Sequence, residues 1–155
     1  MESTAPARDI RILIVDDHPV VREGLSSMLG RQDGLTVVAA LSGGRQAIDF
    51  MKNSAADVAL VDLRMPGISG IDAIRELRRI APRTKVIVLS SFELDEEIYQ
   101  AVEAGANGYL LKEMDSATIF SGIRDVFIGG SCFPGRITQR LAERKQRSKL
   151  SPRER

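Results

Sequence analysis

The sequence predicts an α/β fold in which helices cover both faces of a five-stranded parallel sheet. Five short apolar runs rich in β-branched residues alternate with five longer segments of helical period, which is the pattern of repeated βαβ units. The strand-like runs are nearly continuous in apolar residues, as expected for strands buried on both faces. With 155 residues, 43% of them hydrophobic and 28% charged, the chain has the size and composition of one globular domain.

The expected elements follow one another at short intervals. Strands are expected at residues 10–15 (IRILIV), 35–40 (LTVVAA), 58–61 (VALV), 85–89 (KVIVL) and 108–111 (GYLL). Helices are expected at residues 20–29, 44–52, 70–80, 95–104 and 116–128. Pro19 suits the start of the first helix, where a missing N–H is not needed. Because the strands are parallel, their carboxyl ends meet at one edge, where ligands bind in such folds.

Polar side chains follow four of these strands at that edge. They are Asp16 and Asp17 after the first strand, Asp62 after the third, Ser90 and Ser91 after the fourth, and Lys112 after the fifth. Three close carboxylates repel one another, and a hard cation such as Mg²⁺ relieves that conflict. A lysine supplies a point charge suited to a phosphoryl group, which a carboxylate such as Asp62 can accept. Each residue alone also fits a cap, a turn or a solvated surface, but only a shared site predicts all of these positions together.

These motifs, in this order, resemble those of a two-component response-regulator receiver domain. The acidic pair stands in ILIVDDHPVVREGL, the acceptor in DLRMPG, the hydroxyl in VIVLSS and the lysine in GANGYLLK. The resemblance covers residues 9 to about 129 and implies the flavodoxin-like (CheY-like) doubly wound (βα)5 fold. The segments DDHPVVREGL, GANGYLLK and LSPRER most resemble the subfamily that carries a LuxR-type helix-turn-helix domain (NarL/FixJ-like).

The resemblance implies that Asp62 is the phosphoacceptor, phosphorylated by a cognate sensor histidine kinase. Mg²⁺ is then the implied cofactor, held directly by Asp17, Asp62 and the backbone carbonyl of Arg64. Asp16 would assist as a direct ligand or through water. Arg64, two residues after the acceptor, is expected to affect the lifetime of the acyl phosphate. His18 is expected to begin the loop before the first helix rather than to take part in the chemistry.

The resemblance also implies a conformational switch. Lys112 would pair with Asp62 at rest and with the phosphoryl oxygen afterwards. Ser90 would move to hydrogen-bond the phosphoryl group, and Tyr109 would turn inward into the space that Ser90 leaves. The switch would control homodimerisation and DNA binding, and hence transcription. The chain is therefore expected to be a regulatory domain that catalyses only its own phosphotransfer and dephosphorylation.

Charge and capping signals predict the domain organisation. Residues 136–155 carry eight basic and two acidic residues, whereas residues 1–135 carry 14 and 19. We expect a tail at 1–8, the receiver domain at 9–129, and a basic linker at 130–149 that is helical in part. Ser151 and Glu154 have the spacing of a capping box, and Pro152 suits the first helical position, so residues 150–155 are expected to be the first turn of a truncated LuxR-type domain. DNA would be bound only through the missing part.

Two other functions remain open. A phosphatase with an aspartate nucleophile, of the haloacid-dehalogenase type, needs a second aspartate two residues after the first, where Arg64 stands. A phosphorylation-independent interaction module would be favoured by loss of the acceptor, an acidic residue or the lysine, and none is lost. A flavin-binding function is not indicated, because the segment after the first strand is not the Ser/Thr/Gly-rich loop that would bind the flavin phosphate.

The sequence also predicts where the protein resides. No apolar run approaches the roughly 18 residues of a membrane helix, the N-terminus lacks the apolar core of a secretory signal, and a cytoplasmic location is expected. The single Cys132 excludes an internal disulfide.

Overall fold

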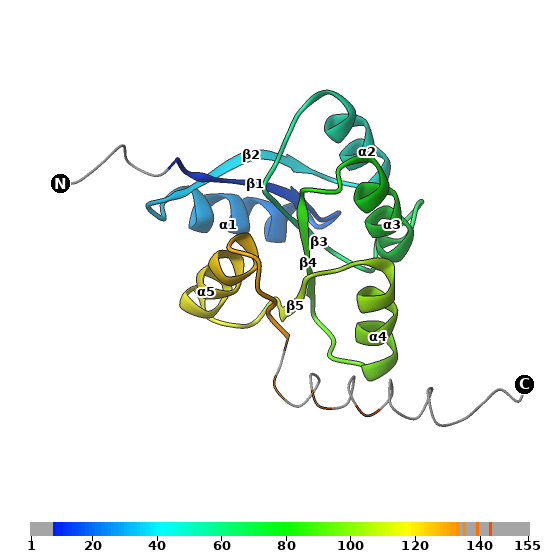
Figure 1. The fold of residues 1–155 in the computed structure, drawn as a ribbon. Helices are drawn as coiled ribbons and strands as arrows, with labels where there is room; N and C mark the ends of the chain where they lie inside the picture. Colours follow the sequence, from blue (N-terminus) through cyan, green and yellow to red (C-terminus); the bar gives the residue numbers. More distant parts are fainter. Residues whose placement is uncertain (1–7, 134, 136–138, 140–142, 144–155) are drawn as a thin grey trace, which may run out of the picture.

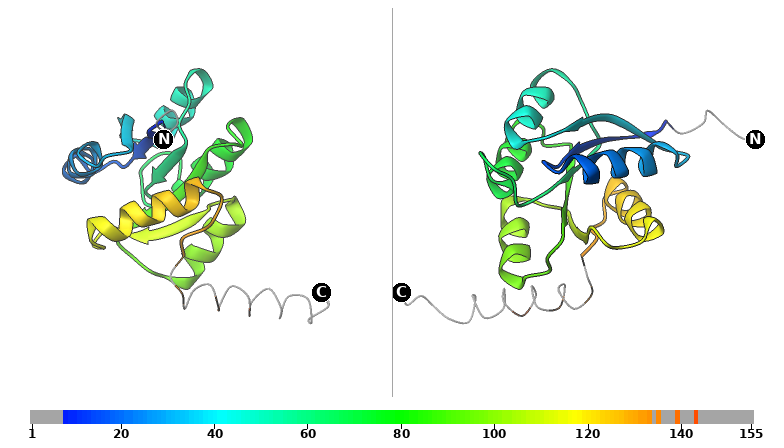
Figure 2. Two further views of the ribbon diagram at one scale, coloured as in Figure 1. Left: turned by 60° about the vertical axis from the view of Figure 1, so that its left-hand side comes forward. Right: turned by 180° about the vertical axis from the view of Figure 1, so that it is seen from behind.

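In the computed structural model, which describes residues 8–133, 135, 139 and 143, five parallel strands form one sheet in the order β2-β1-β3-β4-β5. The strands are β1 (Ile10–Val15), β2 (Leu35–Leu41), β3 (Val58–Val61), β4 (Lys85–Ser90) and β5 (Gly108–Leu111). The helices are α1 (Pro19–Gly30), α2 (Gly44–Asn53), α3 (Gly70–Ile80), α4 (Asp95–Ala104) and α5 (Ser116–Phe127). Helices α1 and α5 cover one face of the sheet, and α2, α3 and α4 cover the other (Figures 1 and 2). The predicted fold class is confirmed.

Each face of the sheet has its own hydrophobic core. In β1, Ile12 and Ile14 belong to the core beneath α1 and α5, whereas Leu13 and Val15 belong to the core beneath α2, α3 and α4. All four side chains are fully buried. Burial on both faces explains why the strand sequences are continuously apolar rather than alternating.

The helix ends lie within one residue of their predicted positions, and side-chain caps mark the starts of two helices. The Ser69 side chain accepts a hydrogen bond from the backbone N–H of Asp72 at the start of α3. The Asp115 side chain accepts one from Thr118 at the start of α5. Each satisfies an N–H that the first helical turn leaves without a partner. Gly105 ends α4 with φ 112°, a backbone conformation that favours glycine.

The start of the predicted linker, after α5, adds an isolated bridge to the edge of the sheet. Cys132 pairs with Gly108 in a parallel bridge at the outer edge of β5, where its carbonyl accepts from the N–H of Tyr109 (2.8 Å). Gly108 makes the approach possible, because a Cβ there would overlap the Cys132 sulfur. Burial raises the pKa of the Cys132 thiol to about 12. The segment is too short to show strand periodicity in the sequence.

The predicted tail and linker lie largely outside the described residues. Of the expected linker at residues 130–149, only residues 130–133, 135, 139 and 143 are described. The expected start of a further domain at residues 150–155 lies outside the described residues, as does most of the expected tail at residues 1–8. Among the described helices, none has both the length and the hydropathy of a membrane span.

Candidate functional site

The predicted acidic residues meet at the carboxyl ends of β1 and β3, which are neighbours in the sheet. The chain leaves β1 for α1 on one face and β3 for α3 on the other (Figure 1), so the two loops diverge and open a crevice. Asp16 and Asp62 lie in that crevice with only 2% and 4% of their surface exposed. The backbone N–H of Asp62 donates to the carbonyl of Val15 (2.9 Å), which fixes the two strand ends against each other.

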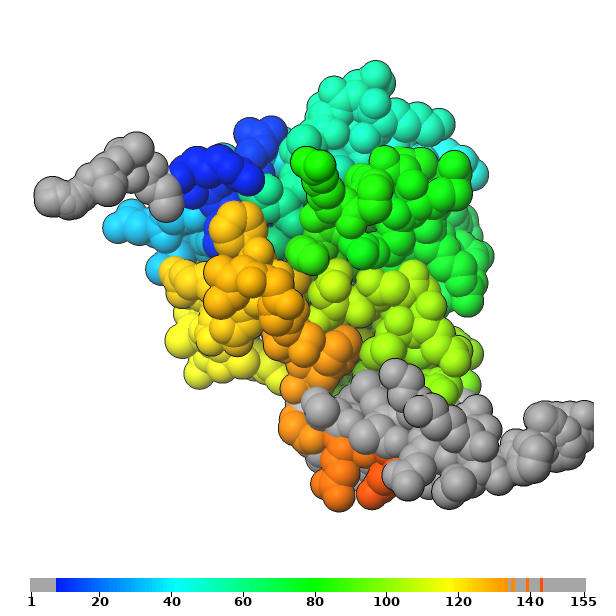
Figure 3. All heavy atoms as spheres, in the orientation of Figure 1, coloured from blue at the N-terminus to red at the C-terminus, as the bar shows by residue number. Residues whose placement is uncertain are grey.

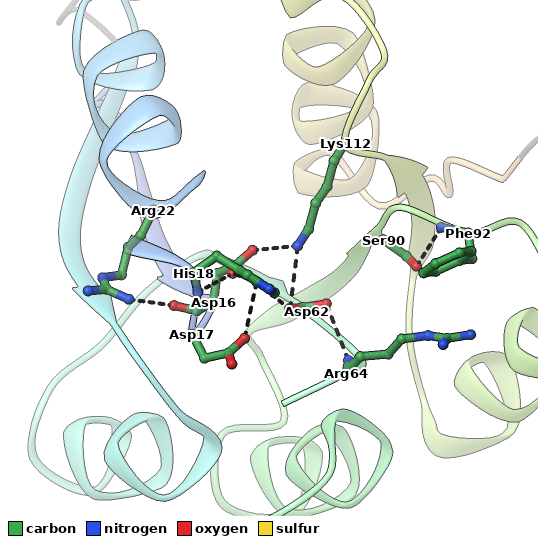
Figure 4. A network of polar contacts seen from close by, with 9 residues as sticks. All are labelled: Asp16, Asp17, His18, Arg22, Asp62, Arg64, Ser90, Phe92 and Lys112. Carbon is green, nitrogen blue, oxygen red and sulfur yellow. Dashed lines mark hydrogen bonds and ion pairs between the residues drawn. The ribbon is translucent and has the colours of Figure 1, made fainter. Parts of the chain in front are cut away.

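Lys112 reaches the two buried carboxylates from the end of β5 (Figure 4). Its Nζ lies 2.8 Å from Oδ2 of Asp16 and 3.4 Å from Oδ2 of Asp62. The backbone N–H of Lys112 donates to the carbonyl of Ser90 (2.8 Å), which ties this residue to the neighbouring strand. The Lys112 ammonium therefore lies between the two carboxylates. It is closer to Asp16 than to Asp62, the partner that the sequence analysis had predicted.

Burial raises the pKa of the Asp62 carboxyl above its ordinary value. The Lys112 ammonium and the Arg64 N–H oppose this effect, whereas the charge of Asp16 adds to it. The Arg64 N–H donates to Oδ1 of Asp62 at 3.2 Å. One oxygen of Asp62 is thus held by the backbone, and the other, Oδ2, faces the lysine.

The acidic cluster fits a divalent cation. Ligand atoms of Asp16, Asp17, His18 and Asp62 all lie within 4.8 Å of one another. One lysine ammonium, 2.8 Å from Oδ2 of Asp16 and 3.4 Å from Oδ2 of Asp62, faces the three carboxylates. Buried carboxylates that outnumber the neighbouring cations repel one another, and a bound Mg²⁺ would offset the remaining negative charge.

His18 also belongs to this cluster, which the sequence did not indicate. Its ring Nδ1 lies 3.1 Å from Oδ1 of Asp16, 3.2 Å from Oδ1 of Asp17 and 3.8 Å from Oδ2 of Asp62 (Figure 4). As expected, the residue immediately precedes α1 and serves as its N-cap. The only signal in the sequence was an imidazole directly after two adjacent aspartates.

The two predicted switch residues both contact the backbone of Phe92. The N–H of Phe92 donates to Oγ of Ser90 (3.1 Å), and the Tyr109 hydroxyl donates to the carbonyl of Phe92 (2.8 Å). The Tyr109 side chain points inward and is fully buried. Burial raises the pKa of its hydroxyl. Ser90 and Tyr109 are therefore connected through one peptide segment between β4 and α4.

A cavity of about 310 Å³ opens between the acidic cluster and this segment. It is lined by His18, Asp62, Arg64, Ser90, Ser91, Phe92 and Lys112. The Arg64 guanidinium lies 4.2 Å from the centre of the Phe92 ring. Its Nη2 lies 2.8 Å from Oε2 of Glu97 on α4. Arg64 thus connects the loop after the acceptor to α4, a contact between residues far apart in the sequence.

The arrangement agrees with what the chain is similar to. Residues 12–124 match the response regulator receiver domain family. The chain is 37% identical over 139 residues to the nitrate/nitrite response regulator protein NarP of Escherichia coli, covering 90% of this chain and 65% of that protein. It is 36% identical over 140 residues to the transcriptional regulatory protein LnrK of Bacillus subtilis, covering 90% and 64%. This chain therefore spans just under two thirds of both relatives.

A solved structure gives the same result. A two-component response regulator of the LuxR family from an Aurantimonas species superposes with a TM-score of 0.80 at 31% identity, covering 88% of this chain and 98% of that one. The fold, the strand-end carboxylates and lysine, and these similarities agree. The chain belongs to the response regulator receiver domain family, and its relatives are two-component regulators of the NarL/LuxR type.

Proposed function

We propose that the chain accepts a phosphoryl group on Asp62 from a sensor histidine kinase and thereby changes conformation. One observation carries the proposal. The buried Asp62 carboxylate borders a cavity that is large enough for a phosphoryl group. The Lys112 ammonium lies 3.4 Å from Oδ2 of Asp62. A buried nucleophile of this kind needs neighbouring positive charge to bind an anionic donor.

In this proposal the two oxygens of Asp62 have different roles. Oδ1 of Asp62 accepts from the Arg64 N–H, so Oδ2 is the oxygen that attacks phosphorus while the donor group leaves. Phosphorylation adds about 1.5 to 2 negative charges and three acceptor oxygens. Lys112 is within reach of these oxygens, and Mg²⁺ held by Asp16, Asp17 and Asp62, with the backbone carbonyl of Arg64 as a further ligand, would neutralise charge on them.

The switch follows from competition for the hydroxyl of Ser90. At present Oγ of Ser90 accepts from the Phe92 N–H. If the Ser90 side chain rotates to donate to a phosphoryl oxygen, its Oγ can no longer accept the hydrogen bond from the Phe92 N–H. The Phe92 segment must then rearrange. The same segment holds the Tyr109 hydroxyl and stacks on Arg64. The phosphoryl group can thereby favour a second arrangement of this segment and of α4, because it makes contacts that only the second arrangement offers.

The output surface in this proposal consists of α4, β5 and α5. Figure 3 shows α4 (yellow-green) and α5 (yellow to orange) on the same face of the molecule. A change at Tyr109 in β5 reaches this surface directly. We propose that the surface mediates homodimerisation, and that residues 9–129 act as the receiver. Residues 130–149 would be the linker and residues 150–155 the start of a helix-turn-helix domain that binds paired DNA half-sites to regulate transcription.

Intact-mass spectrometry after incubation with Mg²⁺ and acetyl phosphate tests the phosphoacceptor. We expect a gain of about 80 Da that is lost in hydroxylamine, as an acyl phosphate requires. Asp62→Asn should abolish the adduct. Asp49→Asn, a matched change at a side chain on α2 that is 65% exposed, should leave it intact. An equal adduct on Asp62→Asn would refute the assignment, and steady turnover of phosphomonoesters would favour the phosphatase alternative.

A further inference from the structure

His18 offers an imidazole nitrogen, a potential metal ligand, among the carboxylates of the described site. Its Nδ1 lies 3.1 and 3.2 Å from oxygens of Asp16 and Asp17 and 3.8 Å from an oxygen of Asp62. Two ligand atoms that each lie about 2.1 Å from one metal ion are about 3.0 Å apart at right angles and at most about 4.2 Å apart. The three separations therefore fall in the range of atoms that share a single ion.

Hydrogen bonds hold the backbone of His18 beside the acidic residues. The N–H of His18 donates to Oδ1 of Asp16 (2.9 Å), and its carbonyl accepts from the N–H of Arg22 in α1 (2.9 Å). Pro19 restricts the preceding residue, His18, to the extended backbone conformation that it adopts (φ −90°, ψ 112°). The Arg22 side chain in turn donates to the carbonyl of Asp16 (2.7 Å). The first turn of α1 thus positions the ring nitrogen over the acidic residues.

The charge balance of the cluster favours a bound cation. Asp16 and Asp62 are more than nine-tenths buried, and the Lys112 ammonium beside them (2.8 and 3.4 Å) offsets only one of the three carboxylates that they form with Asp17. Oxygen ligands alone suit Mg²⁺. An imidazole nitrogen adds little for Mg²⁺ but strengthens binding of borderline ions such as Co²⁺, Ni²⁺ and Zn²⁺.

We propose that His18 is a metal ligand of this site through Nδ1, and that it makes the site selective for first-row transition cations over Mg²⁺. The inference rests on the proposed function, because it uses the same carboxylates. The inference adds His18 to the metal ligands and names first-row transition cations as the preferred class of ion. The side chain is 59% exposed, so an ion can enter from solvent without rearrangement of the buried strands.

Calorimetric titration of the chain with CoCl₂ and with MgCl₂ at one pH tests the proposal. His18→Phe keeps a flat ring but removes both nitrogens. Loss of even an outer partner of a metal ligand costs about 10- to 100-fold in affinity, so His18→Phe should weaken Co²⁺ binding at least about tenfold and change Mg²⁺ binding far less. Val20→Ala, at a neighbouring side chain in α1 that is 82% exposed, should change neither.

A spectroscopic measurement identifies the ligand atom. The chain contains one histidine, so ¹⁵N-histidine labelling reports on His18 alone. Zn²⁺ should shift the Nδ1 resonance in the wild-type chain and should not do so in Asp62→Asn at the same Zn²⁺ concentration. A shift of Nε2 only, or none at saturation, would overturn the assignment.

The two proposals can fail separately. If wild-type protein binds Mg²⁺ and is phosphorylated on Asp62, but His18→Phe leaves the Co²⁺ to Mg²⁺ affinity ratio unchanged, only the role of His18 is refuted. A rise in affinity for both ions in His18→Phe would also refute it, because the ring would then be an obstacle. If the wild-type chain binds neither ion and takes no phosphoryl group, the proposed function fails as well.

Discussion

Replacement of Gly70 by alanine should disturb the acceptor loop directly, because α3 begins against the backbone of that loop. A Cβ at Gly70 would lie 2.5 Å from Cα of Leu63, 2.6 Å from the carbonyl oxygen of Asp62 and 2.9 Å from that of Leu63. The N–H of Gly70 also donates to the Leu63 carbonyl (3.1 Å). All the opposing atoms belong to the backbone, so no side-chain rotation can relieve the overlap.

The size of the effect follows from these distances. Ordinary contacts of a Cβ lie at 3.4–4 Å, so the helix and the loop must separate by about 1 Å. Overpacking of this kind typically costs about 1–3 kcal/mol, and we expect the free energy of unfolding to fall by that amount. Because the same shift moves Asp62, the rate of phosphorylation by acetyl phosphate should fall by up to about 100-fold.

Urea denaturation followed by circular dichroism measures the stability, and intact-mass spectrometry measures the phosphorylation rate. Gly24→Ala is the matched control, because a Cβ at this position in α1 meets nothing within 4 Å. That variant should gain about 0.5–1 kcal/mol from helix propensity and keep the wild-type rate. Wild-type stability and rate in Gly70→Ala would refute the close-packing argument, as would an equal loss in Gly24→Ala.

Three further experiments probe the charges and contacts around the cavity. Asp62→Asn should raise the free energy of unfolding at pH 7, because the folded state raises the pKa of Asp62. Between its ordinary and raised values the folded wild type binds more protons, so wild-type stability falls as pH rises through that window. The advantage of Asn should therefore shrink on acidification, and a pH-independent difference in urea melts would contradict this. Tyr109→Phe should cost about 0.5–1.5 kcal/mol in the same melts through the lost bond to the Phe92 carbonyl; no loss would mean that the bond is not formed in solution. A double-mutant cycle on Arg64 and Glu97 should give a coupling below about 1 kcal/mol that weakens in salt, since both side chains are partly exposed; salt-independent coupling would argue against an ion pair.

The order and kind of the elements could be predicted because burial leaves its pattern in the local sequence. Strands covered on both faces are expected to be mostly apolar. β3 is buried throughout, and β1 and β4 each contain one residue that is not buried, Arg11 and Lys85. Helix starts at Ser69 and Asp115 depend on side chains that satisfy nearby N–H groups. The convergence of the acidic residues on one edge also followed, because parallel strands end on the same side.

The pairing of individual atoms could not be predicted, because it depends on residues distant in the sequence and on the direction of each side chain. Sequence order does not reveal that Lys112 lies nearer to Asp16 than to Asp62, since both partners occupy equivalent strand ends. The approach of Cys132 to Gly108 depends on the space that a missing Cβ leaves at the sheet edge.

The sequence by itself therefore determined the fold, the edge of the sheet that bears the site, and the residue types gathered there. Only the tertiary structure decided that the His18 ring lies among three carboxylates and that Arg64 contacts Glu97, 33 positions away. The physical reason is that periodicity records which face of an element is buried, whereas a contact distance of 3 Å depends on how separate elements pack. That packing is a property of the whole chain.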